Sequence, residues 1–374
     1  MSQKKELLNI GIVCGEHSGD RLGADLINEI KHTFQVNLYG VGGPKLEALG
    51  VKPEFNFSEL NIMGLIDPLI NYRKLTKLRK NLINLFIDKN IDLFIGIDSP
   101  DFNMGIHKAL KKNHTNKNIQ VVSPSVWAWR QNRIKSIQDN IDLTLCLFNF
   151  EDNYYKKVGH KSLHLGHPFS KLQKSDVGQV YSQYKLDESK EYISILPGSR
   201  KSEINNLLPT YIDFIKEYSK RNQNYFFLIP AADKKSFKLI DKHLTDYDLP
   251  VLIKDNAIRD FLSISNLSIT TSGTATLESA ILECPPIICY KTNFFNYLII
   301  SRMLKMKDVG LPNLLLGDRK YSELIQSDCN VANIIQAAEE IQENTPENSK
   351  YAELLRNTLI GKGNSEAAKV ITTL

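Results

Sequence analysis

Short apolar runs alternate with longer amphipathic segments along most of the 374-residue chain. This alternation is typical of βα units with a parallel sheet, because a strand covered on both faces is apolar throughout, whereas a covering helix is apolar on one side only. The pattern predicts strands at LNIGIVC, VNLYGVG, LFIGID, IQVVSPS, DLTLCLF and SLHLG in the first half, and at YISILP, NYFFLIP, PVLIKD, NLSITT and PPIICY in the second. The predicted fold class is therefore α/β, with two Rossmann-like, doubly wound domains.

A polar, weakly patterned stretch separates the two series of strands. It follows LGHPF (165–169) and reads SKLQKSDVGQVYSQYKLDESKEY, a composition typical of a linker. We therefore expect a first domain over residues 1–169, a second over 170–345, and C-terminal helices over 346–374, with the packing of those helices back on the first domain left open. In open α/β sheets, ligands bind beyond the carboxyl ends of the strands, so functional side chains are expected in the loops that follow each strand.

Composition narrows the class of protein. Hydrophobic residues make up 42% of the chain and charged residues 24%, which is enough material for two buried cores. The formal net charge of +5 is too small to indicate a nucleic-acid partner by itself. The five cysteines are scattered without a C-x-x-C pair, which favours reduced core thiols. No signal peptide and no apolar run of about 18–20 residues is found, so we expect a cytoplasmic protein whose membrane contact is at most peripheral.

Two strand-to-helix turns in the second half have the residues of an anion site. In LPGSR, Ser199 and Arg200 follow a glycine, and an arginine can bind phosphate bidentately. An ordinary turn with a surface arginine fits this motif equally well. In TTSGTATLESA, the residues Ser272, Gly273 and Thr274 precede a helix whose first N–H groups favour an anion.

Two further side chains accompany these turns. Glu278 lies about one helical turn after Thr274, where it could accept hydrogen bonds from ribose hydroxyls; the alternative is a capping box, although the spacing is four rather than three. Asn313 in GLPNLLLGDRK is either a helix cap or a cleft residue that reaches a sugar or phosphate. The chain has neither a P-loop nor G-x-G-x-x-G, which argues against an ATPase and against NAD chemistry. A diphosphate held without a lysine suits a stabilised leaving group.

Carboxylates follow two strands of the first half. Asp98 ends the apolar strand of GIDSPDFN, and because a buried carboxylate is costly unless it is partnered, it is a good general-base candidate. Asp101 is explained as a helix N-cap. The loop GEHSGD after the first strand contains Glu16 and Asp20, which would repel a pyrophosphate, so we do not expect a nucleotide there. Ser18 in this loop lacks a nucleophile-elbow motif, and no third ligand accompanies the loop, so no metal site is predicted.

Two other segments carry less specific signals. In SPSVWAWR, Trp127 and Arg130 could stack RNA bases, form a wall for a sugar or pack as a loop, and without a wider basic patch RNA is the least favoured of these. The segment 61–86 combines apolar residues (Met63, Leu65, Leu69) with basic ones (Arg73, Lys74, Lys77). This combination suits an anionic membrane surface, or else a solvated helix face. The segment 294–307 is a second apolar candidate, and exposure of both near the site would indicate a lipid substrate.

Taken in order, the segments GEHSGD, MGLIDPL, GIDSPDFN, SPSVWAWR, LPGSR, TSGTATLE and LPNLL resemble those of the lipid-A-disaccharide synthases, inverting glycosyltransferases of bacterial outer-membrane lipid biosynthesis. SPSVWAWR is the most specific, whereas LPGSR and SGTATLE alone would indicate only a sugar-nucleotide enzyme. The resemblance implies the glycosyltransferase B fold, with UDP on the second domain and the acceptor on the first. It also implies the joining of UDP-2,3-diacylglucosamine to 2,3-diacylglucosamine 1-phosphate at the cytoplasmic face of the inner membrane, without a metal or other cofactor.

The resemblance also implies roles for individual residues. The residues expected to bind the UDP donor are Ser199, Arg200, Ser272, Gly273, Thr274, Glu278 (on the ribose) and Asn313. Asp98 is expected to deprotonate the 6-hydroxyl of the acceptor, with Glu16 as the second candidate base. The residues expected on the acceptor side are Ser18, Asp20, Asp101, Trp127 and Arg130.

Three rival functions make different predictions. A UDP-N-acetylglucosamine 2-epimerase would share the UDP elements but would need no membrane-facing region. A transferase that acts on a polyprenyl-linked peptidoglycan precursor should have a glycine-rich opening loop. A non-enzymatic nucleotide- or RNA-binding protein is supported only by the Trp/Arg cluster and the net charge, and its binding would depend strongly on salt.

Overall fold

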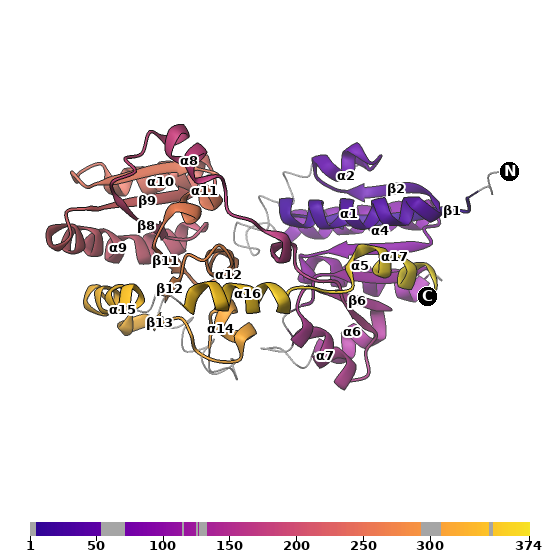
Figure 1. Cartoon of the computed structure of the whole chain (residues 1–374). Helices are drawn as coiled ribbons and strands as arrows, with labels where there is room; N and C mark the ends of the chain where they lie inside the picture. The colour runs from indigo at the N-terminus through magenta and orange to yellow at the C-terminus, as the bar shows by residue number, and fades with distance from the viewer. Residues whose placement is uncertain are drawn as a thin grey trace. The chain divides into compact units, whose positions relative to one another are not determined.

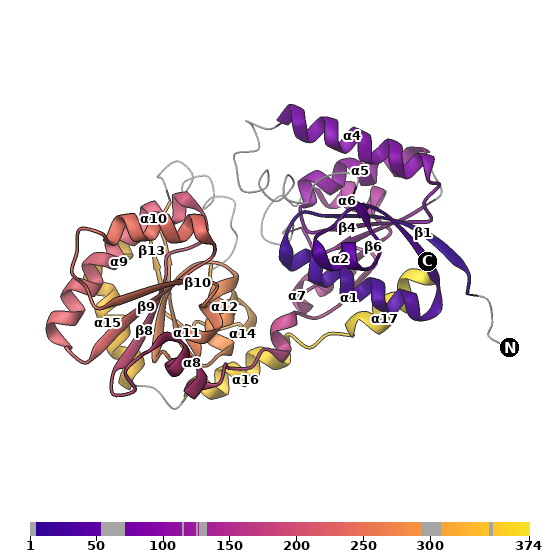
Figure 2. The same ribbon diagram turned by 90° about the horizontal axis from the view of Figure 1, so that it is seen from above.

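The structure is a computed structural model of the chain and describes residues 5–53, 72–113, 116–124, 126, 133–292, 308–343 and 347–374. The chain forms two compact units, one of Met1–His167 with Leu359–Leu374 and one of Pro168–Thr358 (Figures 1 and 2). Both units are α/β with a parallel sheet, which confirms the predicted fold class. The predicted residues that lie outside the described ones are Met63, Leu65, Leu69, Trp127, Arg130 and the segment 294–307.

The first unit is built on a parallel sheet, described in the strand order β3-β2-β1-β4-β5-β6-β7. Its strands are β1 (Leu7–Cys14), β2 (Gln35–Val41), β3 (Lys52–Pro53), β4 (Leu93–Ile97), β5 (Lys117–Val121), β6 (Leu143–Cys146) and β7 (Ser162–His164). Its described helices are α1 (His17–Thr33), α2 (Pro44–Ala48), α4 (Tyr72–Asp88), α5 (Pro100–Asn113), α6 (Ile134–Asn140), α7 (Asn149–Lys157) and α17 (Gly363–Thr372). The strand order reverses at β1 and β4, where Cys14 pairs with Ile97. Ligands of such sheets bind beyond this switch point, so the loops after β1 and β4 form the expected functional edge.

The helices of this unit pack through one apolar face each. On α1, the side chains of Leu26, Ile27 and Ile30 are at most 1% exposed, and their spacing of three and four residues places them on one side of the helix. The last helix, α17, packs beside α1 and adds Ala367 and Ile371 to the same core (Figure 1). Helix α17 therefore belongs to the core of the first unit.

The second unit repeats the architecture with the strand order β10-β9-β8-β11-β12-β13. Its strands are β8 (Glu191–Leu196), β9 (Tyr225–Ala231), β10 (Val251–Asp255), β11 (Leu267–Thr271), β12 (Pro286–Tyr290) and β13 (Glu323–Ile325). Its described helices are α8 (Val177–Tyr184), α9 (Lys201–Arg221), α10 (Lys234–Leu244), α11 (Ile258–Ile264), α12 (Thr274–Ile281), α14 (Leu311–Leu316), α15 (Val331–Glu343) and α16 (Asn348–Thr358), with 3-10 turns η2 (Pro168–Lys171) and η3 (Gln326–Asp328). Here the order reverses at β8 and β11, so the loops after these two strands form the functional edge.

The chain leaves and re-enters the first unit at two neighbouring points. The N–H of His167 donates to the carbonyl of Leu359 at 2.9 Å. Gly166 has a φ of +95°, and a Cβ at this position would lie 2.6 Å from the backbone nitrogen of Gly361, so this approach requires glycine. The units divide after His167, whereas the sequence placed a boundary after residue 169. Of the predicted C-terminal helices, α16 belongs to the second unit and α17 to the first.

Two edge strands were not predicted. They are β3 and β13, which have two and three residues, too few to show a pattern. The predicted strand IQVVSPS also overruns its real end, because β5 stops at Val121 and Val122 turns to a φ of +70°. A β-branched residue in this left-handed region is strained, and it lies at the functional edge of the first sheet.

Candidate active site

Asp98 lies at the carboxyl end of β4, in a left-handed backbone conformation that glycine favours and that, among other residues, Asn and Asp adopt most readily. Its φ is +52°, and that of the next residue, Ser99, is +39°. The N–H of Asp98 donates to the carbonyl of Val121 at 3.0 Å, and the N–H of Ser99 donates to Oδ1 of Asp98 at 2.9 Å. Burial raises the pKa of the Asp98 carboxyl, and the Ser99 hydrogen bond opposes this rise. A raised pKa and a strained backbone are both typical of functional residues.

Two buried side-chain amides hold this turn. Nδ2 of Asn103 and Nε2 of Gln120 both donate to the carbonyl oxygen of Asp98, at 2.9 and 3.1 Å. Gly96 leaves them room, because a Cβ there would lie 3.0 Å from both Asn103 and Oε1 of Gln120. Neither amide was predicted from the sequence as a site residue. A usable signal was the glutamine inside the apolar run IQVV, since a polar residue in a buried strand needs a partner.

The opening loop after β1 lies at the same edge of the sheet, because β1 and β4 pair. Glu16 is exposed and forms the N-cap position of α1, and Ser18, in the first turn of that helix, is also exposed. Asp20, in contrast, is 2% exposed, and its carboxylate accepts hydrogen bonds from the backbone N–H groups of Lys45 (2.9 Å) and Leu46 (3.1 Å). Asp20 therefore fixes the start of α2.

The carboxylates at this edge of the sheet influence the pKa of the Cys14 thiol at the end of β1. Burial raises the pKa of Cys14 to about 12, and the carboxylates of Asp20, Asp98 and Glu16 contribute to the rise. Three carboxylates from two loops thus gather around the end of β1. Asp101, in the first turn of α5, pairs instead with Arg133 just before α6, and its side chain is 68% exposed.

The turn after β8 is occupied by a carboxylate of the chain itself. Oε2 of Glu203 accepts hydrogen bonds from the N–H groups of Ser199 and Arg200, both at 3.2 Å, and Oε1 lies 3.2 Å from Nη1 of Arg200. Glu203 thus makes one half of a capping box at the start of α9, and the guanidinium of Arg200 has no acceptor with which to make the other half. The Arg200 side chain remains 68% exposed.

The turn after β11 has a different construction. Gly273 forms the N-cap of α12 with a φ of +155°, and none of the described side chains caps this helix. Gly273 and Thr274 are exposed, and no atom of the described residues lies within 4 Å of a Cβ built on Gly273. The hydroxyl of Ser272 donates to the carbonyl of Val309 at 3.1 Å, and that of Thr276 donates to Gly273 at 2.7 Å. Both hydroxyls fix the turn, and the N–H groups at the start of α12 can receive an anion.

Glu278 lies on α12, about one turn beyond this start. Burial raises the pKa of its carboxyl to about 7, and the positive charge of Arg259 opposes the rise. Near neutral pH this carboxyl exchanges readily between its protonated and ionised forms. It can therefore accept hydrogen bonds from a diol, or donate one.

Asn313 lies in the first turn of α14 and is fully buried. Its Nδ2 donates to the carbonyl of Tyr321 and to Oε1 of Glu323, both at 2.8 Å, and its Oδ1 accepts from the N–H groups of Lys320 and Tyr321, both at 2.9 Å. Both amide hydrogens and both lone pairs are thus in use. Asn313 therefore orders residues 320–323. Glu323, which was not predicted as a site residue, also accepts from the N–H groups of Val309 (2.9 Å) and Gly310 (3.0 Å), and so holds the segment next to Ser272.

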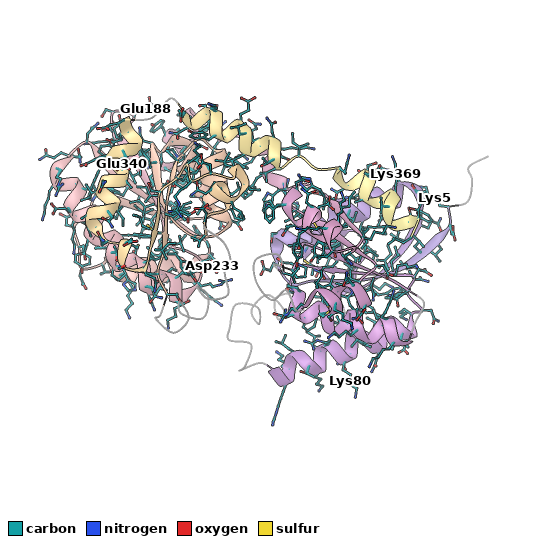
Figure 3. The ribbon with its side chains drawn as sticks, turned by 90° about the horizontal axis from the view of Figure 1, so that it is seen from below. Lys5, Lys80, Glu188, Asp233, Glu340 and Lys369 are labelled. Atoms are coloured by element: carbon teal, nitrogen blue, oxygen red, sulfur yellow. The ribbon has the colours of Figure 1, made fainter. Side chains whose placement is uncertain are left out.

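The predicted basic helix is α4. Arg73, Lys74 and Lys77 are exposed, while Leu78 and Leu82 face the core. Figure 3 shows Lys80 on the solvent side of the same helix. The described part of α4 therefore has a basic outer face and an apolar inner one.

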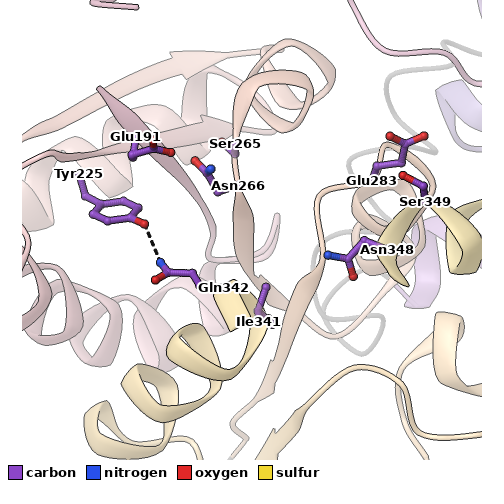
Figure 4. A pocket seen from close by; sticks show the side chains of 9 residues that line it. All are labelled: Glu191, Tyr225, Ser265, Asn266, Glu283, Ile341, Gln342, Asn348 and Ser349. Atoms are coloured by element: carbon purple, nitrogen blue, oxygen red, sulfur yellow. Dashed lines mark hydrogen bonds between the residues drawn. The ribbon is translucent and has the colours of Figure 1, made fainter. Parts of the chain in front are cut away.

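A pocket of about 500 Å³ lies at the opposite, amino edge of the second sheet (Figure 4). It is lined mainly by polar side chains, and the hydroxyl of Tyr225 accepts a hydrogen bond from Gln342 at 2.6 Å. Glu191 and Asn266 stand beside the starts of β8 and β11. Because ligands of such sheets bind at the carboxyl edge, this pocket is not the candidate site.

The described residues contain no group of three or more His, Cys, Asp or Glu side chains that could hold a metal ion. Over the same ranges, no helix has the length and apolar content needed to cross a membrane.

Comparison with solved structures shows the fold. A UDP complex of MnaA from S. aureus superposes with a TM-score of 0.63 at 14% identity, covering 98% of this chain and 95% of that one. MurG from Acinetobacter baumannii superposes with a TM-score of 0.55 at 10% identity, covering 99% of this chain and all of that one (100%). At these identities the similarity concerns the fold alone.

Comparison of sequences is more specific. The family model described as lipid-A-disaccharide synthetase matches residues 10–373. The lipid-A-disaccharide synthase of Hahella chejuensis is 38% identical over 335 residues, covering 88% of this chain and 84% of that protein. Lipid-A-disaccharide synthase 2 of Legionella pneumophila strain Paris is 34% identical over 375 residues, covering 98% and 97%. These matches confirm the predicted resemblance: the chain belongs to the lipid-A-disaccharide synthase family.

Proposed function

We propose that this protein transfers 2,3-diacylglucosamine from UDP-2,3-diacylglucosamine to the 6-hydroxyl of 2,3-diacylglucosamine 1-phosphate. The reaction proceeds with inversion and gives the β(1→6)-linked tetraacyl disaccharide 1-phosphate and UDP. The observation that carries the proposal is the family match over residues 10–373. The chemistry of the two sheet edges supports it.

Asp98 is the proposed general base. Its carboxylate takes the proton of the acceptor's 6-hydroxyl as that oxygen attacks the anomeric carbon of the donor. Burial raises the pKa of this carboxyl, and a base is more effective when its pKa approaches the working pH. Glu16, which follows the neighbouring strand, is the second candidate. The exposed Ser18 belongs to the same proposed acceptor side, together with Asp101, Trp127 and Arg130.

The start of α12 is the proposed site of the donor diphosphate. As the new glycosidic bond forms, the bond from the anomeric carbon to the diphosphate oxygen breaks, and its electron pair remains on UDP. The N–H groups beyond Ser272 and Gly273 stabilise this charge, together with Thr274 and the exposed guanidinium of Arg200. Attack from the face opposite the leaving group accounts for inversion.

Glu278 is proposed to hold the ribose hydroxyls, and Asn313 to support the donor site by holding Glu323, which binds the loop beside Ser272. We further propose that the protein works at the cytoplasmic face of the inner membrane. The basic outer face of α4, with Arg73, Lys74 and Lys77, suits an anionic lipid surface.

The proposal is tested with purified protein, UDP-2,3-diacylglucosamine and the monosaccharide 1-phosphate. We expect release of UDP together with the tetraacyl disaccharide 1-phosphate, unchanged by EDTA. Absence of UDP release would contradict the function. Release of UDP without disaccharide would favour hydrolysis, and loss of activity in EDTA would contradict only the metal-independent part.

A further inference from the structure

The buried polar network beneath Asp98 includes two side chains that the proposed chemistry does not use. We propose that Gln120 and His107 are positioning residues for Asp98, which hold its backbone in the left-handed conformation and thereby set the direction of its carboxylate. The inference rests on the proposed function, because it concerns the proposed base.

The backbone at this edge of the first sheet is strained at three positions. Asp98 and Ser99 are consecutive non-glycine residues with positive φ, and Val122 on the adjacent loop has a φ of +70°. Such conformations are costly and persist only when the surrounding structure determines them from several sides. The three residues surround the carboxyl ends of β4 and β5.

The side chain of Gln120 contacts the backbone at two of these positions. Nε2 of Gln120 lies 3.1 Å from the carbonyl oxygen of Asp98, 3.0 Å from that of Val121 and 3.3 Å from that of Val122. One buried carboxamide, 1% exposed, thus faces carbonyls from both strained loops. Because carbonyls only accept hydrogen bonds, the NH₂ group of Gln120 must face them, and its oxygen must point the other way.

The carboxamide oxygen of Gln120 contacts the ring of His107. Oε1 of Gln120 lies 3.1 Å from Nε2 of His107. Since Oε1 is an acceptor, Nε2 must carry the hydrogen, and the neutral ring then has its lone pair on Nδ1. Among the described residues, Nδ1 has no hydrogen-bond partner. Burial lowers the pKa of His107 to about 4, so the ring stays neutral at physiological pH.

The network therefore has a direction, from His107 through Gln120 to the carbonyl of Asp98. Loss of the imidazole N–H would leave Oε1 of Gln120 buried without a donor and would free the amide to rotate. Asn103 also donates to the carbonyl of Asp98, so the turn would loosen rather than collapse. Small displacements of a reacting group are known to cost large factors in rate.

The test uses His107→Phe, which keeps an aromatic ring against Phe94 (ring centroids 4.8 Å apart) but cannot donate. His107→Gln is the conservative variant, because its amide can donate to Oε1 of Gln120. Thr144→Val is the matched control: Oγ1 of Thr144 lies 2.9 Å from Nε2 of His160, a buried histidine contact in the same sheet that does not touch Asp98. The values of kcat and KM are measured for each variant across pH, below its melting temperature, and His107→Phe is also combined with Asp98→Asn.

We expect His107→Phe to lower kcat by about tenfold or more with little change in KM, His107→Gln to restore most of it, and Thr144→Val to leave kcat unchanged. In the Asp98→Asn background, His107→Phe should have no further effect on kcat, because the group that it positions is already lost. Equal kcat for His107→Phe and Thr144→Val, or a full additional loss in the Asp98→Asn background, would overturn the inference. An inactive wild-type enzyme would instead contradict the proposed function.

Discussion

The carboxyl edges of the two sheets follow the same construction rules and carry opposite chemistry. At the first edge, carboxylates gather at the strand ends: Asp98 follows β4, and Glu16 and Asp20 follow β1. At the second edge, the turn before α12 presents a glycine, hydroxyls and backbone N–H groups, with no carboxylate in the first turn of the helix. Carboxylates at the first edge can remove a proton from a hydroxyl, whereas backbone N–H groups at the second edge can stabilise a diphosphate leaving group.

The second edge contains its own internal contrast. Helices α9 and α12 both begin after a central strand, but Glu203 accepts from the N–H groups of Ser199 and Arg200 just before α9, whereas none of the described side chains places a carboxylate at the turn before α12. The motif LPGSR therefore looks like an anion site in sequence but is occupied by a carboxylate in the structure. A strand-to-helix turn indicates a phosphate site only when the chain does not fill it itself.

The largest effect should come from removing the base at the first edge. Asp98→Asn keeps the size of the side chain, and asparagine tolerates the left-handed backbone, so the fold should persist. We expect kcat to fall by about 10²–10⁴-fold with KM little changed. Because burial raises the pKa of Asp98, the wild-type rate should fall on acidification at a pH above the usual carboxyl range. Steady-state kinetics across pH measure both effects, and near-normal turnover of Asp98→Asn would transfer the role to Glu16.

The buried carboxyl of the second edge predicts a pH dependence of stability. The folded pKa of Glu278 is about 7, above its ordinary 4.5, so the unfolded chain ionises first. The difference in unfolding free energy between wild type and Glu278→Gln should therefore fall as the pH rises from about 4.5 to about 7, and stay level above that. At about 1.4 kcal/mol per pKa unit, the fall should be roughly 2–4 kcal/mol. Urea unfolding of both proteins measures it, and a difference that is independent of pH would contradict the burial of this carboxyl.

A carboxylate can be introduced at the start of α12 to imitate the one that Glu203 provides at the start of α9. Thr274→Asp places a carboxylate in the first turn of α12, where it should repel a diphosphate and weaken UDP binding by about tenfold. The matched control, Thr274→Asn, has the same shape without the charge. An acid at a helix N-terminus is stabilising, so the melting temperature should not fall. Titration calorimetry with UDP measures the affinity, and equal affinities of the Asp and Asn variants would place the diphosphate elsewhere.

Local patterns predicted much of this molecule. The central strands are buried on both faces, so their apolar runs identified them, and Asp98 stood out because a carboxylate ended such a run. The edge strands β3 and β13 were missed because they are too short to have a pattern. Val122 was expected to continue a strand, and only the fold reveals its left-handed backbone.

These patterns did not predict contacts between residues that are far apart in the sequence. Gln120 contacts Asp98 from 22 residues away, and no spacing rule links the two. Asp20 was expected on the acceptor side, but its carboxylate binds N–H groups 25 and 26 residues further along the chain. Asn313 was expected near the donor, and the structure shows its whole hydrogen-bonding capacity used by residues 320–323. Residue type predicts capacity for hydrogen bonds, whereas the fold determines which partner uses it.

The smallest predicted effect concerns the carboxylate that fills the start of α9. Glu203→Gln removes the negative charge beside Ser199 and Arg200, so a diphosphate that reaches this turn would meet less repulsion. We expect UDP to bind a few-fold more tightly, while the weaker cap lowers the free energy of unfolding by about 1 kcal/mol. Glu217→Gln is the matched control, because Glu217 pairs with Arg221 at 3.0 Å near the far end of the same helix. If both variants bind UDP as the wild type does, the α9 turn takes no part in binding the diphosphate, and the donor site is confined to α12.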